Sequence, residues 1–164
     1  MIRLSRLADY GIVIMTHLAS ERGRQLSTPD IAAATAVPQP MTSKILKILA
    51  RAELLVSHRG AHGGYGLARD ADAITVADVI EALDGPIALT ACVEAGPGDC
   101  SIERLCPARA NWQRLNGAIR EALSGISIAE MARSVPSAFL LPGELALPSS
   151  SGVAGRLQSN LGVR

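Results

Sequence analysis

The chain has 164 residues, enough for one domain with a substantial core and a tail. Hydrophobic residues make up 48% of it and only 2% are aromatic, so Leu, Ile, Val and Ala must build the core, which suits packed helices. An odd number of cysteines does not suit a disulfide framework, and no run approaches the roughly 20 apolar residues of a membrane helix. The apolar run at residues 11–15 is too short for a signal peptide, so we expect a cytoplasmic protein without a membrane partner.

The net charge of +1 conceals an uneven distribution of charge along the chain. Residues 1–69 hold nine Lys and Arg against four Asp and Glu, whereas residues 70–164 hold seven against eleven. The N-terminal part is therefore suited to a polyanion such as nucleic acid, and the remainder is not. Ordinary surface charge gives similar imbalances, so a nucleic-acid partner depends on finding a motif as well.

The N-terminal part has the pattern of a helix-turn-helix. Residues 4–20 carry apolar side chains at helical spacing. Ser27 is placed to cap a second helix, which runs to about Thr35 and has a proline and an aspartate in its first turn. A short turn follows, and Pro40 opens a third helix that ends near Ala52. A short Ala-rich helix, a tight turn and a further helix are typical of DNA-binding proteins.

The helix from Pro40 to Ala52 has two different faces. One is predicted to pack inward and carries Thr42, Ile45, Leu46 and Leu49. The other is predicted to face solvent and carries Met41, Ser43, Lys44 and Lys47. Small polar and basic side chains near a helix N-terminus can enter the major groove of DNA, although an ordinary amphipathic surface helix would show the same pattern.

A β-hairpin is predicted directly after this helix. Residues 54–58 and 65–68 read as two strands, and the glycine-rich tip between them includes Arg59 and His62. A hairpin in this position is the wing of a winged helix, and these two side chains are candidates for contacts with phosphates or the minor groove. A nucleotide-phosphate loop is the less favoured interpretation, because no helix follows the glycines and no GxGxxG motif is present.

Two more helices are expected on either side of a loop. The first covers residues 75–83, with Thr75 as its cap and Gly85 close to its end. The second starts at Pro107 and reaches about Ser124, and a further turn covers residues 128–133. The long helix has an apolar stripe suited to pairing with a second copy of itself, formed by Trp112, Leu115, Ile119, Leu123 and Ile126. From Ser134 the chain is rich in Pro, Ser and Gly, as in a flexible tail.

All three cysteines lie between those two helices, at Cys92, Cys100 and Cys106. The intervening segment is rich in Gly and Pro, so it can wrap three thiolates around one small group. Thiolates are soft ligands that favour an iron–sulfur cluster, Zn(II) or Cu(I), and a cluster or zinc site would need one more ligand. Three unrelated thiols in a loop are the alternative.

The chain resembles the Rrf2-type winged-helix transcription regulators, which include the iron–sulfur cluster assembly regulator (IscR type) and nitric-oxide-sensing repressors. The resemblance covers about residues 1–133 and rests on Arg3-Leu4, Asp9-Tyr10, the helix-turn-helix at 27–53, the wing at 59–65, the segment 78–82 and the three cysteines. The segments 57–65 and 85–90 look most like the subgroup that regulates the sulfur-mobilisation (SUF) assembly operon.

This resemblance implies a mainly α-helical fold with a small β-hairpin. It divides the chain into a winged helix-turn-helix DNA-binding domain, a cysteine loop that binds a cluster, a dimerisation helix and a flexible tail, at residues 1–84, 85–106, 107–133 and 134–164. The implied function is a homodimeric regulator, most simply a repressor, that binds a pseudo-palindromic site in double-stranded DNA. Its DNA affinity would depend on a [2Fe–2S] or [4Fe–4S] cluster held by Cys92, Cys100 and Cys106 and sensitive to redox state, nitric oxide or iron supply.

The fourth ligand is where this chain departs from the IscR pattern. IscR-type proteins have a His three residues after the third cysteine, whereas this chain has Arg109, which stays protonated and cannot ligate. Some nitric-oxide-sensing relatives place an acidic ligand in the first helix, so the resemblance indicates Asp9 of the other subunit, with His17 in reserve. A solvated carboxylate is the simpler interpretation of Asp9.

Two other functional classes remain open from the sequence. A zinc-stabilised DNA-binding protein without a sensing role would also use three thiolates and one further ligand. A redox protein that carries a cluster is the second class. The sequence contains no paired catalytic carboxylates in one motif and no cysteine partnered by a nearby His, so we expect no enzyme.

Overall fold

The computed structural model describes residues 3–21, 23–58, 60, 63–90, 93 and 105–133. In chain order, its elements are α1 (Arg6–Ser20), α2 (Thr28–Thr35), α3 (Gln39–Arg51), β1 (Leu55–His58), β2 (Gly64–Leu67), the 3₁₀ turn η1 (Ala71–Ala73), α4 (Val76–Asp84), α5 (Arg109–Ser124) and α6 (Ile128–Arg133). The strands β1 and β2 form an antiparallel hairpin. The described part of the chain is thus mainly helical with one small hairpin, which confirms the predicted fold class.

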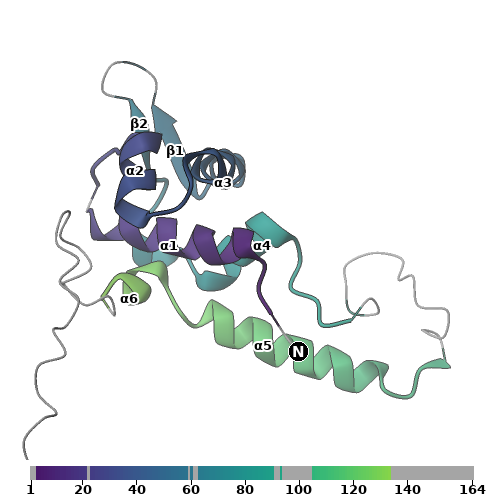
Figure 1. The fold of residues 1–164 in the computed structure, drawn as a ribbon. Coiled ribbons are helices and arrows are strands. Elements are labelled where there is room, and N and C mark those ends of the chain that lie inside the picture. Colours follow the sequence, from purple (N-terminus) through teal and green to yellow (C-terminus); the bar gives the residue numbers. More distant parts are fainter. Residues whose placement is uncertain are drawn as a thin grey trace, which may run out of the picture.

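Helix α1 lies at the centre of the arrangement (Figure 1). On one side of it lie α2, α3 and the hairpin, and on the other side lies α6. Helix α4 packs against both α1 and α3, and α5 packs against α4 and extends away from the other helices. The helix-turn-helix and wing therefore occupy one end of the molecule, and the long helix α5 occupies the other.

Side-chain caps explain where three of the helices begin. The Ser5 hydroxyl accepts hydrogen bonds from the backbone N–H groups of Leu7 and Ala8, both at 3.1 Å, and so starts α1. The predicted caps Ser27 and Thr75 are both confirmed, at the starts of α2 and α4. At α4 the side chain of Asp78 also accepts from the backbone N–H of Thr75 at 2.9 Å, which completes a capping box.

One hydrophobic core joins α1, α3 and α4. The four positions of α3 that were predicted to pack inward, Thr42, Ile45, Leu46 and Leu49, are all fully buried. Helix α1 contributes Ile14, Met15 and Leu18, α4 contributes Val79 and Ile80, and Ile128 of α6 closes the far side. A Cβ at Gly11 would collide with the side chain of Leu83, so glycine at this position lets α1 and α4 approach closely.

Several details of the structure differ from the sequence-based expectation. Helix α1 begins at Arg6 rather than at residue 4, because Ser5 is its cap. The turn η1 was not predicted, and neither was the isolated bridge between Thr75 and Ser127. The turn η1 is too short to show a helical apolar spacing, and the bridge pairs residues that are far apart in the sequence. Among the described residues, none of the helices has the length and apolar character to cross a membrane.

Candidate nucleic-acid interface

A buried threonine fixes the orientation of α3. The hydroxyl of Thr42 can donate to the carbonyl oxygens of Val37 at 3.2 Å and Pro38 at 3.3 Å, in the turn that precedes the helix. In the same turn, Ala36 takes a left-handed conformation with φ of 55°, which reverses the chain between α2 and α3. The buried apolar face of α3 and this anchored turn together present the opposite face of the helix to solvent.

The outward face of α3 is basic. The predicted reading residues Lys44 and Lys47 are exposed, and Ser43 beside them is half-buried. Met41 is also half-buried and packs against the core, so only part of its side chain is available at the surface. Arg51, which was not predicted as a reading residue, is exposed as well and lies one turn beyond Lys47. Residues seven apart lie on the same face of a helix, so its spacing from Lys44 could have identified it from the sequence.

The wing is attached to the helix-turn-helix by a backbone bridge. Tyr65 of β2 pairs with Leu26, the residue just before the cap of α2. A Cβ at Gly64 would lie 2.5 Å from the carbonyl oxygen of Leu26, so only glycine fits at that position without a shift. The wing residues Arg59 and His62 lie outside the described residues. The last paired residues of the hairpin are His58, which directly precedes Arg59, and Gly64, which lies two residues after His62.

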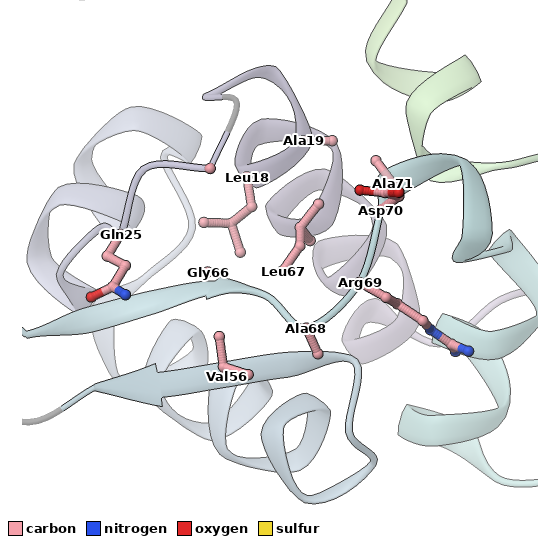
Figure 2. A pocket seen from close by; sticks show the side chains of 11 residues that line it. Leu18, Ala19, Gln25, Val56, Gly66, Leu67, Ala68, Arg69, Asp70 and Ala71 are labelled. Carbon is pink, nitrogen blue, oxygen red and sulfur yellow. The ribbon is translucent and has the colours of Figure 1, made fainter.

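A groove of about 510 Å³ lies between the end of α1 and the root of the hairpin (Figure 2). Leu18, Val56 and Leu67 give it an apolar floor. Arg69 points away from this floor toward α4, where its guanidinium lies 3.6 Å from the carboxylate of Asp78. Specific small-molecule sites combine an apolar lining with polar groups that converge on the ligand. The polar side chains of this groove do not converge, because Gln25 lies on the opposite side from Arg69 and Asp70 (Figure 2), so the groove is a poor candidate for such a site.

The cysteine loop joins the DNA-binding part of the chain to α5. Cys106 is a half-buried free thiol three residues before α5, and its carbonyl accepts from the backbone N–H of Arg109 at 3.3 Å. Cys92 and Cys100 lie outside the described residues. Within the part of the chain that the structure describes, no three His, Cys, Asp or Glu side chains gather as a metal site. Three thiolates in one loop nevertheless suit iron–sulfur or zinc chemistry.

The apolar stripe of α5 is only partly covered in the single chain. Trp112 is 38% exposed, Leu115 is 51% exposed and Ile126, just beyond the helix, is 37% exposed. Ile119 and Leu123 are half-buried, and Leu123 packs against the core. Helix α5 itself contains no fully buried residue. A long helix that leaves large apolar side chains exposed along one side is suited to a protein interface.

The two candidate fourth ligands lie on α1. Asp9 is exposed in its first helical turn, one turn after Ser5. The Ser5 hydroxyl donates to the carboxylate of Asp84 at 2.6 Å, so this end of α1 adjoins the end of α4 where the loop segment begins. His17 is half-buried near the other end of the helix. Burial lowers its pKa, and the nearby Glu21 carboxylate opposes this shift only in part.

A helix-turn-helix with an anchored hairpin and an exposed basic helix defines a winged-helix DNA-binding protein. Residues 4–134 match the Rrf2 family, which is described as iron-dependent transcriptional regulators. The chain belongs to this family, which confirms the resemblance seen in the sequence.

Relatives and solved structures agree with this assignment. The chain is 31% identical over 142 residues to protein aau3 of Rhizobium meliloti strain 1021, across 87% of this chain and 92% of aau3. Its fold is similar to the structure of CymR (YrzC), the global cysteine regulator of B. subtilis, with a TM-score of 0.66, 30% identity and coverage of 83% of this chain and 100% of CymR. It is also similar to T. potens IscR, with a TM-score of 0.61, 28% identity and coverage of 87% of this chain and 94% of the IscR chain.

Proposed function

We propose that this chain is a cytoplasmic, dimeric transcription regulator whose affinity for DNA depends on an iron–sulfur cluster in the loop 85–106. Its DNA-reading residues are Met41, Ser43, Lys44 and Lys47 on α3, with Arg59 and His62 on the wing. Its cluster ligands are Cys92, Cys100 and Cys106, with Asp9 of the second subunit as the fourth. Its target is a pseudo-palindromic promoter of cluster-assembly genes of the SUF type or of stress genes, at which it acts as a repressor.

One observation carries this proposal, namely the position of the loop between α4 and α5. Helix α4 packs against α3, which presents the basic reading face. Helix α5 carries the exposed apolar stripe that suits a dimer contact. The loop joins these two helices and contains every cysteine of the chain. A change in its conformation can therefore alter the relative position of the two DNA-binding domains in a dimer.

The geometry of operator binding makes small movements important. Two winged helices in a dimer read half-sites roughly 34–36 Å apart, so a modest rotation of α4 against α5 moves a reading helix out of register. An iron–sulfur cluster supplies a centre that oxidants, nitric oxide or iron shortage can alter. The loop residues then need only favour one of two dimer geometries for DNA affinity to change.

The test is anaerobic purification of the full chain, followed by iron and sulfide analysis and by DNA binding of the cluster-loaded and metal-free forms. We expect a coloured dimer whose two forms differ in affinity for one promoter fragment. A colourless protein that contains zinc and binds DNA equally well with and without the metal would favour the zinc-stabilised alternative. Reversible electron transfer with no DNA binding would favour a redox carrier.

The likeness to CymR favours a second candidate function. CymR of B. subtilis is a global cysteine regulator, and 100% of that chain is covered at 30% identity. On this interpretation, the chain would regulate genes of cysteine metabolism, and its three thiols would not hold a cluster. Absence of iron and sulfide from the anaerobic protein, together with binding to promoters of cysteine-metabolism genes, would identify this second function.

A further inference from the structure

One side chain of α5 binds the backbone at the start of the cysteine loop. The carboxamide of Asn116 donates to the carbonyl oxygen of Ile87 at 2.8 Å. The oxygen of the same carboxamide accepts from the backbone N–H of Leu89 at 3.0 Å. Asn116 therefore satisfies two backbone groups on either side of Ala88, in a segment that belongs to none of the assigned helices or strands.

The next turn of α5 is attached to α4. Arg120 donates two hydrogen bonds to the carboxylate of Glu81, at 2.8 and 3.3 Å. The hydrogen bonds and charge of Glu81 also raise the pKa of Arg120. Because residues four apart share a helix face, Asn116 and Arg120 lie on the same side of α5. This side holds the last turns of α4 and the first residues of the loop in one fixed arrangement.

We propose that Asn116 is a positioning residue that transmits the state of the cysteine loop to α5. This inference rests on the proposed function, because the state in question is the occupancy of the cluster site. Residues 87–89 precede Cys92 by only a few residues, so a change at the thiolates acts on backbone that Asn116 holds against α5. Without that attachment, the loop can change its conformation while α5 stays where it is.

The first measurement is amide hydrogen exchange in the metal-free full chain, which reports on the attachment alone. In Asn116→Ala, we expect the Leu89 amide to exchange roughly five- to tenfold faster, as the loss of one neutral hydrogen bond implies. Asn116→Asp keeps an acceptor for the Leu89 amide but replaces the donor to Ile87 by a carboxylate oxygen that repels this carbonyl, so exchange at Leu89 should also become faster. Asn111→Ala is the matched control, because Asn111 is an exposed asparagine on the same helix.

The second measurement is the ratio of DNA affinities of the cluster-loaded and metal-free forms. In Asn116→Ala, this ratio should shrink toward one by roughly two- to thirtyfold, while Asn111→Ala keeps the wild-type ratio. A purely structural role would lower the melting temperature of both forms and leave the ratio unchanged. If Asn116→Ala does not fold, Asn116→Asp takes its place in both measurements.

The outcomes separate this inference from the function on which it rests. Faster exchange at Leu89 with a wild-type affinity ratio would overturn the transmission role, and so would unchanged exchange in both Asn116 variants. A wild-type protein that holds no cluster would overturn the proposed function and the transmission role together. In that case, the exchange data would still show whether Asn116 holds the loop.

Discussion

Leu26 and Tyr65 exchange both of their backbone hydrogen bonds, at 2.8 and 3.0 Å, although they are 39 positions apart in the sequence. This reciprocal pair adds the residue before α2 to the edge of the hairpin. Two backbone hydrogen bonds therefore attach the hairpin strand β2 to the residue that precedes the helix-turn-helix.

Gly64→Ala tests this attachment. The added Cβ would lie 2.5 Å from the Leu26 carbonyl oxygen, so the bridge must open or the strand must shift. We expect a loss of about 1–3 kcal/mol in the free energy of unfolding, measured with urea, and weaker DNA binding.

Gly117→Ala is the control for this substitution. A Cβ at Gly117 meets nothing within 4 Å, and the residue lies inside α5. Replacing an unhindered helical glycine by alanine should leave stability unchanged or raise it by up to about 1 kcal/mol. If Gly64→Ala is as stable as Gly117→Ala and binds DNA like the wild type, this attachment contributes neither to stability nor to DNA binding.

Lys44→Ala and Arg59→Ala test the reading face. Each should weaken binding to a promoter fragment and reduce the slope of log affinity against log salt by roughly one, if each contacts one phosphate. Arg133→Ala is the control, because α6 lies across α1 from α3 (Figure 1). Wild-type affinity of both variants at every salt concentration would contradict the assignment of these residues to the DNA interface.

Much of the fold could be predicted from local sequence signals. Ser27 and Thr75 mark helix starts through hydrogen bonds to nearby backbone, so short segments suffice to find them. The buried face of α3 follows from spacing alone, because its four inward positions recur at helical intervals. Such signals depend on residues within one or two turns of each other.

The features that were missed depend on contacts between distant segments. Nothing near Leu26 predicts its pairing with Tyr65, and nothing near Asn116 predicts that it binds residues 87–89. The exposed basic face of α3 was predicted at Lys44 and Lys47 but not at Arg51, although local helical spacing alone places Arg51 on that face. The cluster ligands remain predictions, since Cys92 and Cys100 lie outside the described residues.

Replacing Cys92, Cys100 or Cys106 by Ala should abolish or destabilise the cluster and leave a folded dimer. The buried core residues all lie outside the loop, and of the described loop residues only Ile87, five residues before Cys92, packs against them, so the fold does not require the cysteines to bury its apolar side chains. Iron and sulfide analysis and light scattering measure the two effects. Ser101→Ala, in the same loop, should keep both cluster and dimer. Loss of the dimer in all three cysteine variants would indicate a structural metal instead.

His17 should make the metal-free protein less stable at acidic pH. Burial lowers its pKa from the ordinary value of 6.5, so the unfolded chain binds a proton more readily than the folded chain does. The free energy of unfolding therefore decreases as the pH falls from about 7 through 6.5, and it levels off below the folded pKa. Urea unfolding at pH 7 and pH 5.5 should show a smaller decrease in His17→Gln than in the wild type.

Glu21→Gln should increase this dependence of stability on pH, whereas His17→Gln should reduce it. The Glu21 carboxylate raises the pKa of His17, so its removal should lower that pKa further and extend the loss of stability to lower pH. The same two pH values and the same denaturant apply. Equal pH dependence in the wild type and both variants would show that burial of His17 does not affect its protonation in the folded protein.

Asp9 is the proposed fourth ligand, and its position on α1 supports that role. Residues four apart share a helix face, so Asp9 lies on the same side of α1 as Ser5, whose hydroxyl contacts Asp84 at the end of α4. That side adjoins the start of the loop segment. Asp9 is exposed in the single chain, which leaves its carboxylate accessible to a second subunit.

Asp9→Ala should shift the visible spectrum of the anaerobic protein and hasten bleaching in air, with the dimer intact by light scattering. A carboxylate is a hard, exchangeable ligand for iron, so its loss changes the coordination of one iron without removing any thiolate. Asp30→Ala is the control, because Asp30 is an exposed aspartate in the first turn of α2. An unchanged spectrum and an unchanged lifetime in Asp9→Ala would exclude Asp9 as a ligand, and the same measurements on His17→Ala would then test the remaining candidate on α1.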